Sequence, residues 1–80
     1  MRLDKYLKVS RLIKRRTIAN EACDAGKVMV NGKPARASYD VKVDDVIHLD
    51  LGVRQLQVQV VAVQETVAKN DAAMLYKIVP

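Results

Sequence analysis

The sequence predicts an α+β fold in which N-terminal helices pack on a small antiparallel β-sheet. Up to residue 25, apolar side chains recur at helical spacing, and after Gly26 they alternate with polar ones at the period of two that is typical of strands. The pair Asn31-Gly32 between two short extended runs indicates a hairpin, which makes its neighbours antiparallel. The order of helices first and strands afterwards favours the α+β class, and 80 residues allow a single domain over 1–80.

The first predicted helix covers residues 2–14. One side of it is apolar or small: Leu3, Tyr6, Leu7, Ser10 and Ile13. Four cations follow one another at i+3 steps over the rest of its surface: Arg2, Lys5, Lys8 and Arg11. Asp4 lies in the first turn, where the helix dipole favours an anion, and four residues before Lys8, the favourable order for an ion pair. Val9 and Ser10 are candidates for a break, and the pattern leaves the end of this helix open.

The second predicted helix covers residues 16–25. Its expected buried side consists of Ile18, Ala19, Ala22, Cys23 and Ala25, and its expected wet side of Arg16, Thr17, Asn20, Glu21 and Asp24. Gly26 is the expected residue after the helix, because it adopts the left-handed conformation that closes one. Cys23 on the alanine face is interpreted as a small buried hydrophobic residue.

The remaining elements are predicted as strands. They cover residues 27–30, 33–35, 46–51 and 55–63, and a short helical turn leads into a last strand within 72–79. The segment 65–72 is predicted to be a polar connection.

Positive charge is concentrated at the N-terminal end. The formal net charge is +5, and seven of the 14 lysines and arginines lie in the first sixteen residues. This asymmetry favours nucleic acid as a partner over a protein that is merely basic. Because Phe and Trp are absent, we expect contact with the phosphates and 2′-hydroxyls of folded RNA and not base stacking. The run Lys14-Arg15-Arg16 at the start of the second helix is a candidate phosphate grip.

No catalytic or metal-binding constellation is recognisable. His48 is the single histidine, Cys23 the single cysteine, and the pair Asp44-Asp45 is interpreted as turn chemistry before a strand. We therefore expect a non-enzyme with no cofactor and no metal. No apolar run is long enough to span a membrane and no secretory signal is recognisable, so we expect no membrane partner and a cytoplasmic location.

Several motifs occur in an ordered combination. They are Arg2-Leu3-Asp4-Lys5-Tyr6-Leu7, Arg16 with Ala19, Gly26-Lys27-Val28, Val30-Asn31-Gly32 and, later, Ser38, Val41 and Asp45-Val46-Ile47. Together they resemble the S4 (alpha-L) RNA-binding domain family, with a motif core over about 1–51 and further strands within 52–80. Two positions depart from the family pattern. Arg15 stands where a Ser or Thr helix cap is usual, and Val43-Asp44 stands where Pro-Gly is usual.

Within this family, the sequence most resembles the small stand-alone members that act in ribosome quality control. It implies a monomer that binds large ribosomal subunits obstructed by peptidyl-tRNA and lies between rRNA and the P-site tRNA. It further implies support of C-terminal alanine tailing of the stalled chain, with the tail-elongating factor RqcH on the same subunit. The expected RNA-binding residues are the motif arginines Arg2 and Arg16 with Lys5, Lys8, Arg11, Lys14, Arg15 and Asn20. Asn31 and Gly32 are expected to serve the hairpin, and Asp4 to orient a nearby arginine.

Three other functions stay open. The domain type also occurs in pseudouridine synthases and tyrosyl-tRNA synthetases, so the chain could be the RNA-binding module of an enzyme. A heat-shock-type large-subunit recycling factor of the same family resembles the chain over the same region and carries a long basic C-terminal extension. A basic adaptor for an acidic protein would fit the charge alone.

Overall fold

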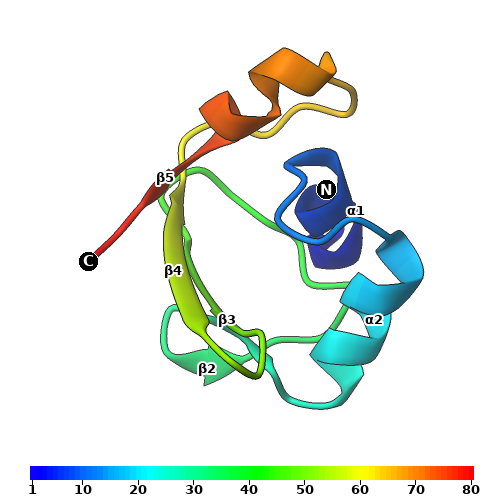
Figure 1. Ribbon diagram of the computed structural model, residues 1–80, viewed down its shortest axis with the longest axis vertical. Coiled ribbons are helices and arrows are strands. Elements are labelled where there is room, and N and C mark those ends of the chain that lie inside the picture. The colour runs from blue at the N-terminus through cyan, green and yellow to red at the C-terminus, as the bar shows by residue number, and fades with distance from the viewer.

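Two short helices lie beside a five-stranded antiparallel sheet in the computed structural model, which describes residues 1–80 (Figure 1). The helices are α1 (Leu3–Val9) and α2 (Arg16–Asp24). The strands are β1 (Val28–Val30), β2 (Lys33–Pro34), β3 (Val46–Asp50), β4 (Gln55–Val60) and β5 (Tyr76–Ile78). They pair in the order β2-β1-β3-β4-β5, and a 3-10 helix, η1 (Lys69–Leu75), precedes the last strand. The predicted α+β class is confirmed.

The β1–β2 hairpin forms as its sequence predicts. Asn31 and Gly32 have φ angles of 53° and 84°, the positive values that a two-residue type I′ turn requires. The Asn31 side chain is also bonded, because its Nδ2 donates to Asp45 Oδ1 at 3.0 Å and its Oδ1 accepts from the Val46 amide at 3.0 Å. The hairpin role expected for this pair is therefore confirmed.

The core lies between the helices and the sheet. Leu3, Tyr6 and Leu7 of α1 are completely buried, as are Ile47 and Leu49 on the inner face of β3. The alternation predicted for 55–63 is confirmed over β4, where Val58 and Val60 are buried and Gln57 and Gln59 keep contact with solvent, but the strand ends at Val60, three residues earlier than predicted. Burial of this apolar face holds α1 in a fixed position against the sheet.

The helix predicted for residues 2–14 is too long at both ends. Arg2 has extended backbone at the N-cap, and α1 ends at Val9 with Ser10 as its C-cap, so the break considered at Val9 and Ser10 is confirmed. Arg11 has a φ of 62°, and the Ile13 amide donates to the Leu7 carbonyl at 3.1 Å. The chain thus folds back across the end of α1, which returns Ile13 to the core.

The buried side of α2 is narrower than predicted. Ala19 and Cys23 are buried, but Ile18 is 49% exposed and Ala25 is exposed beyond the end of the helix. Gly26 has a φ of 76°, so its predicted role in closing the helix is confirmed.

The pair Asp44-Asp45 is more than a solvated turn. Asp45 is buried and accepts hydrogen bonds from Asn31, from the Tyr39 hydroxyl at 2.9 Å and from the Lys42 amide at 2.9 Å. Burial raises the pKa of Asp45, but these donors outweigh it and the net pKa lies below the ordinary value. Asp44 has a φ of 77° at the position where the family pattern has glycine. The interpretation of both residues as simple turn chemistry is correct for Asp44 only.

The C-terminal segment is fastened to α1 by one buried hydrogen bond. The Tyr6 hydroxyl donates to the Leu75 carbonyl at 2.8 Å, and the same carbonyl accepts from the Val61 and Ala62 amides. Burial raises the pKa of Tyr6 well above its ordinary value. The predicted helical turn before the last strand is confirmed as η1, although it begins at Lys69 inside the segment predicted to be irregular.

Replacing Tyr6 by Phe should lower the free energy of unfolding by about 1 kcal/mol, the usual net contribution of one hydrogen bond, and lower Tm by about 4–8 °C. Tyr76→Phe is the matched control, since the half-buried Tyr76 makes no hydroxyl hydrogen bond. Thermal denaturation followed by circular dichroism measures both variants. Equal Tm values for the two would contradict a structural role of the Tyr6 hydroxyl.

Candidate nucleic-acid interface

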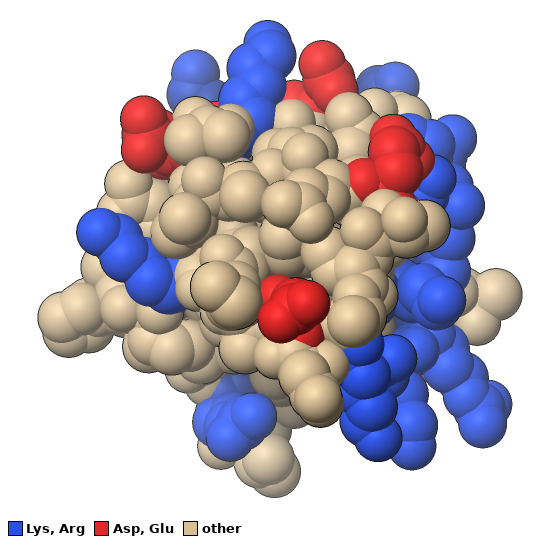
Figure 2. All heavy atoms as spheres, turned by 90° about the horizontal axis from the view of Figure 1, so that it is seen from above, with Lys and Arg blue, Asp and Glu red and all other residues tan.

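Lysine and arginine side chains gather along one side of the molecule in Figure 2, the side on which the helices lie in Figure 1. Five of the expected RNA-binding residues line one open hollow of about 410 Å³: Lys5, Lys8, Arg11, Lys14 and Arg16. Its other lining residues are Val9 and the segment Glu65, Thr66 and Val67. We call this surface the helical hollow.

The helical hollow depends on the turn between the two helices. Lys5 and Lys8 project from α1, Arg16 begins α2, and Arg11 and Lys14 lie in the connecting turn. Because Arg11 adopts the left-handed conformation, the predicted stripe of four cations at i+3 steps is wrong at its two ends, Arg2 and Arg11. The turn nevertheless brings Arg11 and Lys14 to the same hollow as the cations of α1.

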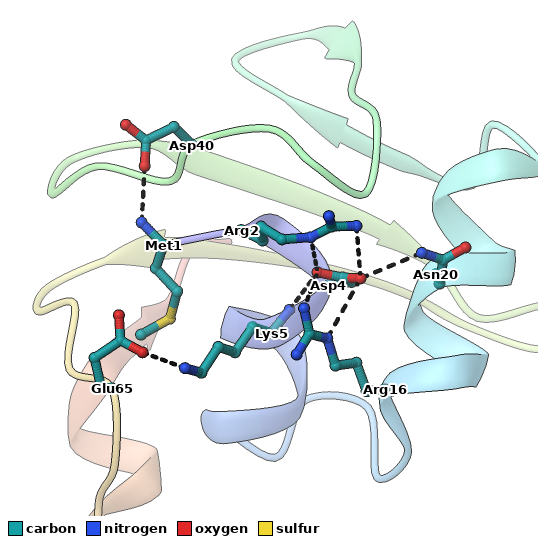
Figure 3. A network of polar contacts seen from close by, with 8 residues as sticks. All are labelled: Met1, Arg2, Asp4, Lys5, Arg16, Asn20, Asp40 and Glu65. Atoms are coloured by element: carbon teal, nitrogen blue, oxygen red, sulfur yellow. Dashed lines mark hydrogen bonds and ion pairs between the residues drawn. The ribbon is translucent and has the colours of Figure 1, made fainter.

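Asp4 lies at the centre of a hydrogen-bond network that joins the two helices (Figure 3). Its side chain is 3% exposed. Arg2 donates through Nε to Oδ1 at 3.1 Å and through Nη2 to Oδ2 at 3.3 Å. The Nη2 of Arg16 lies 3.5 Å from Oδ1, and its Nε lies 3.5 Å from Oδ2. Asn20 Nδ2 adds a bond to Oδ2 at 3.2 Å, and the Lys5 amide donates to Oδ1 at 2.8 Å. The expected role of Asp4 as an orienting partner of arginine is confirmed, and the expected pairing with Lys8 is wrong.

This network determines the charge state of Asp4. Burial raises the pKa of the carboxyl group, but the bonds from Arg2, Asn20 and Arg16 and the positive charge of Arg16 outweigh burial and lower the net pKa. Asp4 is therefore ionised at neutral pH and holds two guanidinium groups in place. Both arginines remain half exposed, so each keeps N–H donors for a ligand.

Asn20 and Arg15 differ from the five cations of the helical hollow. Asn20 is half buried and already bonded to Asp4, so part of its hydrogen-bonding capacity is structural. Arg15 is the N-cap residue of α2, makes no capping bond with its side chain and is exposed. The predicted start of the second helix at Arg16 is confirmed.

Glu65 contacts the basic surface from a distant part of the chain. Its carboxylate forms an ion pair with the Lys5 ammonium group at the edge of the helical hollow, and the hydrogen bond from Lys5 lowers the pKa of Glu65 (Figure 3). Sequence reasoning missed Glu65, because sixty positions separate it from Lys5. No local pattern connects them.

Other reactive groups are occupied or buried. His48 Nε2 lies 3.0 Å from Gln55 Oε1, and burial raises the pKa of the Cys23 thiol to about 11. No group of three His, Cys, Asp or Glu residues is placed to hold a metal ion. None of the helices has the length and apolar character needed to cross a membrane.

Known proteins are similar to this chain in both sequence and fold. A family model described as "S4 domain" matches residues 1–47. A "RQC P-site tRNA stabilizing factor" of Bacillus subtilis is 50% identical over 78 residues, which cover 98% of this chain and 91% of the relative. The factor of the same name from Streptococcus pneumoniae is 49% identical over 79 residues, or 99% and 90% of the two chains. The trimeric structure of Vibrio cholerae Heat Shock Protein 15 superposes with a TM-score of 0.92 at 29% identity, covering 99% of this chain and 81% of that one.

Replacing Asp4 by Asn should lower the free energy of unfolding by about 1–3 kcal/mol, because two arginines lose a buried anionic partner. The folded-state pKa lies below the unfolded value, so this contribution is present above pH 3.8 and is lost as the pH falls through the folded-state pKa. Urea denaturation between pH 7 and pH 3 measures it. The gap between wild type and Asp4→Asn should be widest at neutral pH and narrow on acidification.

The matched control is Asp71→Asn, which removes an exposed carboxylate without an ion pair. A gap as small for Asp4→Asn as for Asp71→Asn at pH 7 would show that the network does not stabilise the fold.

Proposed function

The chain belongs to the S4 domain family, and from this premise we propose that it is an RNA-binding ribosome quality-control factor. It binds large ribosomal subunits obstructed by peptidyl-tRNA and contacts both rRNA and the P-site tRNA. One observation carries the proposal: Arg2 and Arg16, the two motif arginines, are both held by the buried Asp4 beside a hollow lined by five cations. Nearly full-length similarity to factors named for P-site tRNA stabilisation supports the choice of RNA.

Binding is achieved by neutralising phosphates on a rigid surface. Lys5 and Lys8 are presented by a helix whose opposite side is completely buried, so binding does not have to order the backbone, as it would for a disordered tail. No aromatic side chain lines the helical hollow, which favours recognition of backbone shape over base stacking. On the subunit the protein holds the P-site tRNA while RqcH extends the stalled chain with alanine. It acts as a cytoplasmic monomer and performs no chemical step itself.

A heat-shock-type recycling factor is the second candidate. The close superposition with Heat Shock Protein 15 favours it, since both proteins present the same fold. Sequence identity is considerably higher to the factors named for P-site tRNA stabilisation, which supports the quality-control function. Alanine tailing separates the two candidates, because a recycling factor does not require it.

Replacing Arg16 by Ala should weaken binding to obstructed large subunits about tenfold or more, the effect of losing charge-assisted hydrogen bonds worth 1.5–3 kcal/mol. Arg2 and Asn20 still pair with Asp4 in this variant, so the fold should survive. Co-sedimentation with subunits through sucrose measures binding, and alanine-tail synthesis in a reaction with RqcH measures function. Arg54→Ala, at an exposed arginine of the β3–β4 turn, is the control.

Wild-type protein and Arg54→Ala should increase tail synthesis, and Arg16→Ala should not. If Arg16→Ala co-migrated with large subunits at the wild-type level, Arg16 would not be an RNA-binding residue. Tail synthesis that is unaffected by the wild-type protein would favour the recycling function instead.

Replacing Lys8 by Ala should flatten the dependence of log K on log salt by about one unit, because one phosphate contact and its released counterions are lost. The measurement is a titration of obstructed subunits at several salt concentrations and constant magnesium. Lys77→Ala is matched in charge and exposure but lies in β5, and its slope should equal that of wild type. Parallel slopes for all three proteins would indicate that Lys8 belongs to a merely solvated face.

A further inference from the structure

A second hollow, of about 420 Å³, opens beyond the Asp4 network from the helical hollow. Its polar lining residues are Arg2, Asn20, Asp24, Arg36 and Ser38, none of which lines the helical hollow. In Figure 3, Arg2 approaches the Asp4 carboxylate from one side and Arg16 from the other; Arg2 lines the second hollow and Arg16 the helical hollow. Each hollow therefore contains one of the two guanidinium groups that Asp4 holds.

The backbone around Arg36 is held in place by hydrogen bonds, and the Arg36 side chain has no partner within the protein. It lies in the loop between β2 and β3, whose next residues pair with the start of α1: the Leu3 amide donates to the Tyr39 carbonyl at 2.8 Å and the Asp4 amide to the Ala37 carbonyl at 3.1 Å. These bonds fix the loop beside Arg2. The Arg36 side chain is exposed and forms neither an ion pair nor a hydrogen bond within the protein.

The donors of this second hollow suit a phosphodiester backbone. Arg2 uses Nε and Nη2 for Asp4, which leaves the remaining N–H groups of its guanidinium available, and Arg36 has its whole guanidinium available. Arginine binds phosphate oxygens in pairs, and the Ser38 hydroxyl adds a neutral donor. No aromatic ring lines the hollow to stack on a base, and its lining carries two arginines against the single acid Asp24.

We infer that this second hollow binds a segment of RNA backbone separate from the one in the helical hollow, with Arg36 and Arg2 as its phosphate ligands. The inference rests on the proposed function and extends the RNA contact from the helices onto the β2–β3 loop. Asp4 then holds Arg2 toward one backbone segment and Arg16 toward the other.

The test compares Arg36→Ala, Arg36→Lys, Arg16→Ala and the double variant Arg16→Ala/Arg36→Ala with wild type, using obstructed large subunits at several salt concentrations. Arg36→Ala should weaken binding about tenfold and flatten the salt slope by about one unit. Arg36→Lys keeps the charge and should restore the slope while losing part of the affinity. The double variant should flatten the slope by about two units, because the two contacts are separate. Arg54→Ala controls for net charge, and circular dichroism spectra like that of wild type verify the fold of each variant.

An Arg36→Ala slope equal to that of wild type, with a flattened slope for Arg16→Ala, would overturn the inference and leave the proposed function standing. A double variant no flatter than Arg16→Ala would show a single shared contact and would overturn it as well. Wild-type slopes for both single variants would remove the proposed interface altogether.

Discussion

A carboxylate withdrawn from water needs hydrogen-bond donors, and Asp4 receives them from Arg2, Arg16, Asn20 and the Lys5 amide. These donors come from the start of α1 and from α2, so satisfying one buried anion also fixes how the two helices meet. The same bonds hold the two arginines that face outward. Stability and the placement of positive charge are thus coupled at a single side chain, and a change at Asp4 alters both.

Much of the fold was predictable because its signals are local. A positive φ at Asn31 and Gly32 is a property of those two residues, and the alternation along β4 reports directly which face is buried. At the end of α1 the sequence offered Val9 and Ser10 as candidates for a break, but it gave no sign of the path that the chain takes afterwards. A left-handed turn at Arg11 follows and brings Ile13 back to the core, and this tertiary contact leaves no local pattern in the sequence.

The residues of the candidate site also fall into those that a local sequence pattern indicates and those that it does not. The cations of the first sixteen residues were recognisable by their density, and the structure brings five of the eight expected residues to one hollow. Arg36 lies outside the dense run of cations in the first sixteen residues, and Glu65 lies on a distant segment, so neither shows a local signal. Asp44 and Asp45 illustrate the limit well: two identical neighbouring side chains differ in burial because only Asp45 meets Asn31 and Tyr39.

The bond between Tyr6 and Leu75 joins residues that are 69 positions apart. Such a separation raises the contact order of the domain, and non-local contacts slow folding because a long loop must close before they form. The S4 family match ends at residue 47, yet α1 packs in a core that includes Val58, Val60 and Leu75. On a translating ribosome the basic helices therefore emerge long before the strands that complete their core. The basic surface on α1 has its complete supporting core only once the chain has been synthesised as far as Leu75 and can fold.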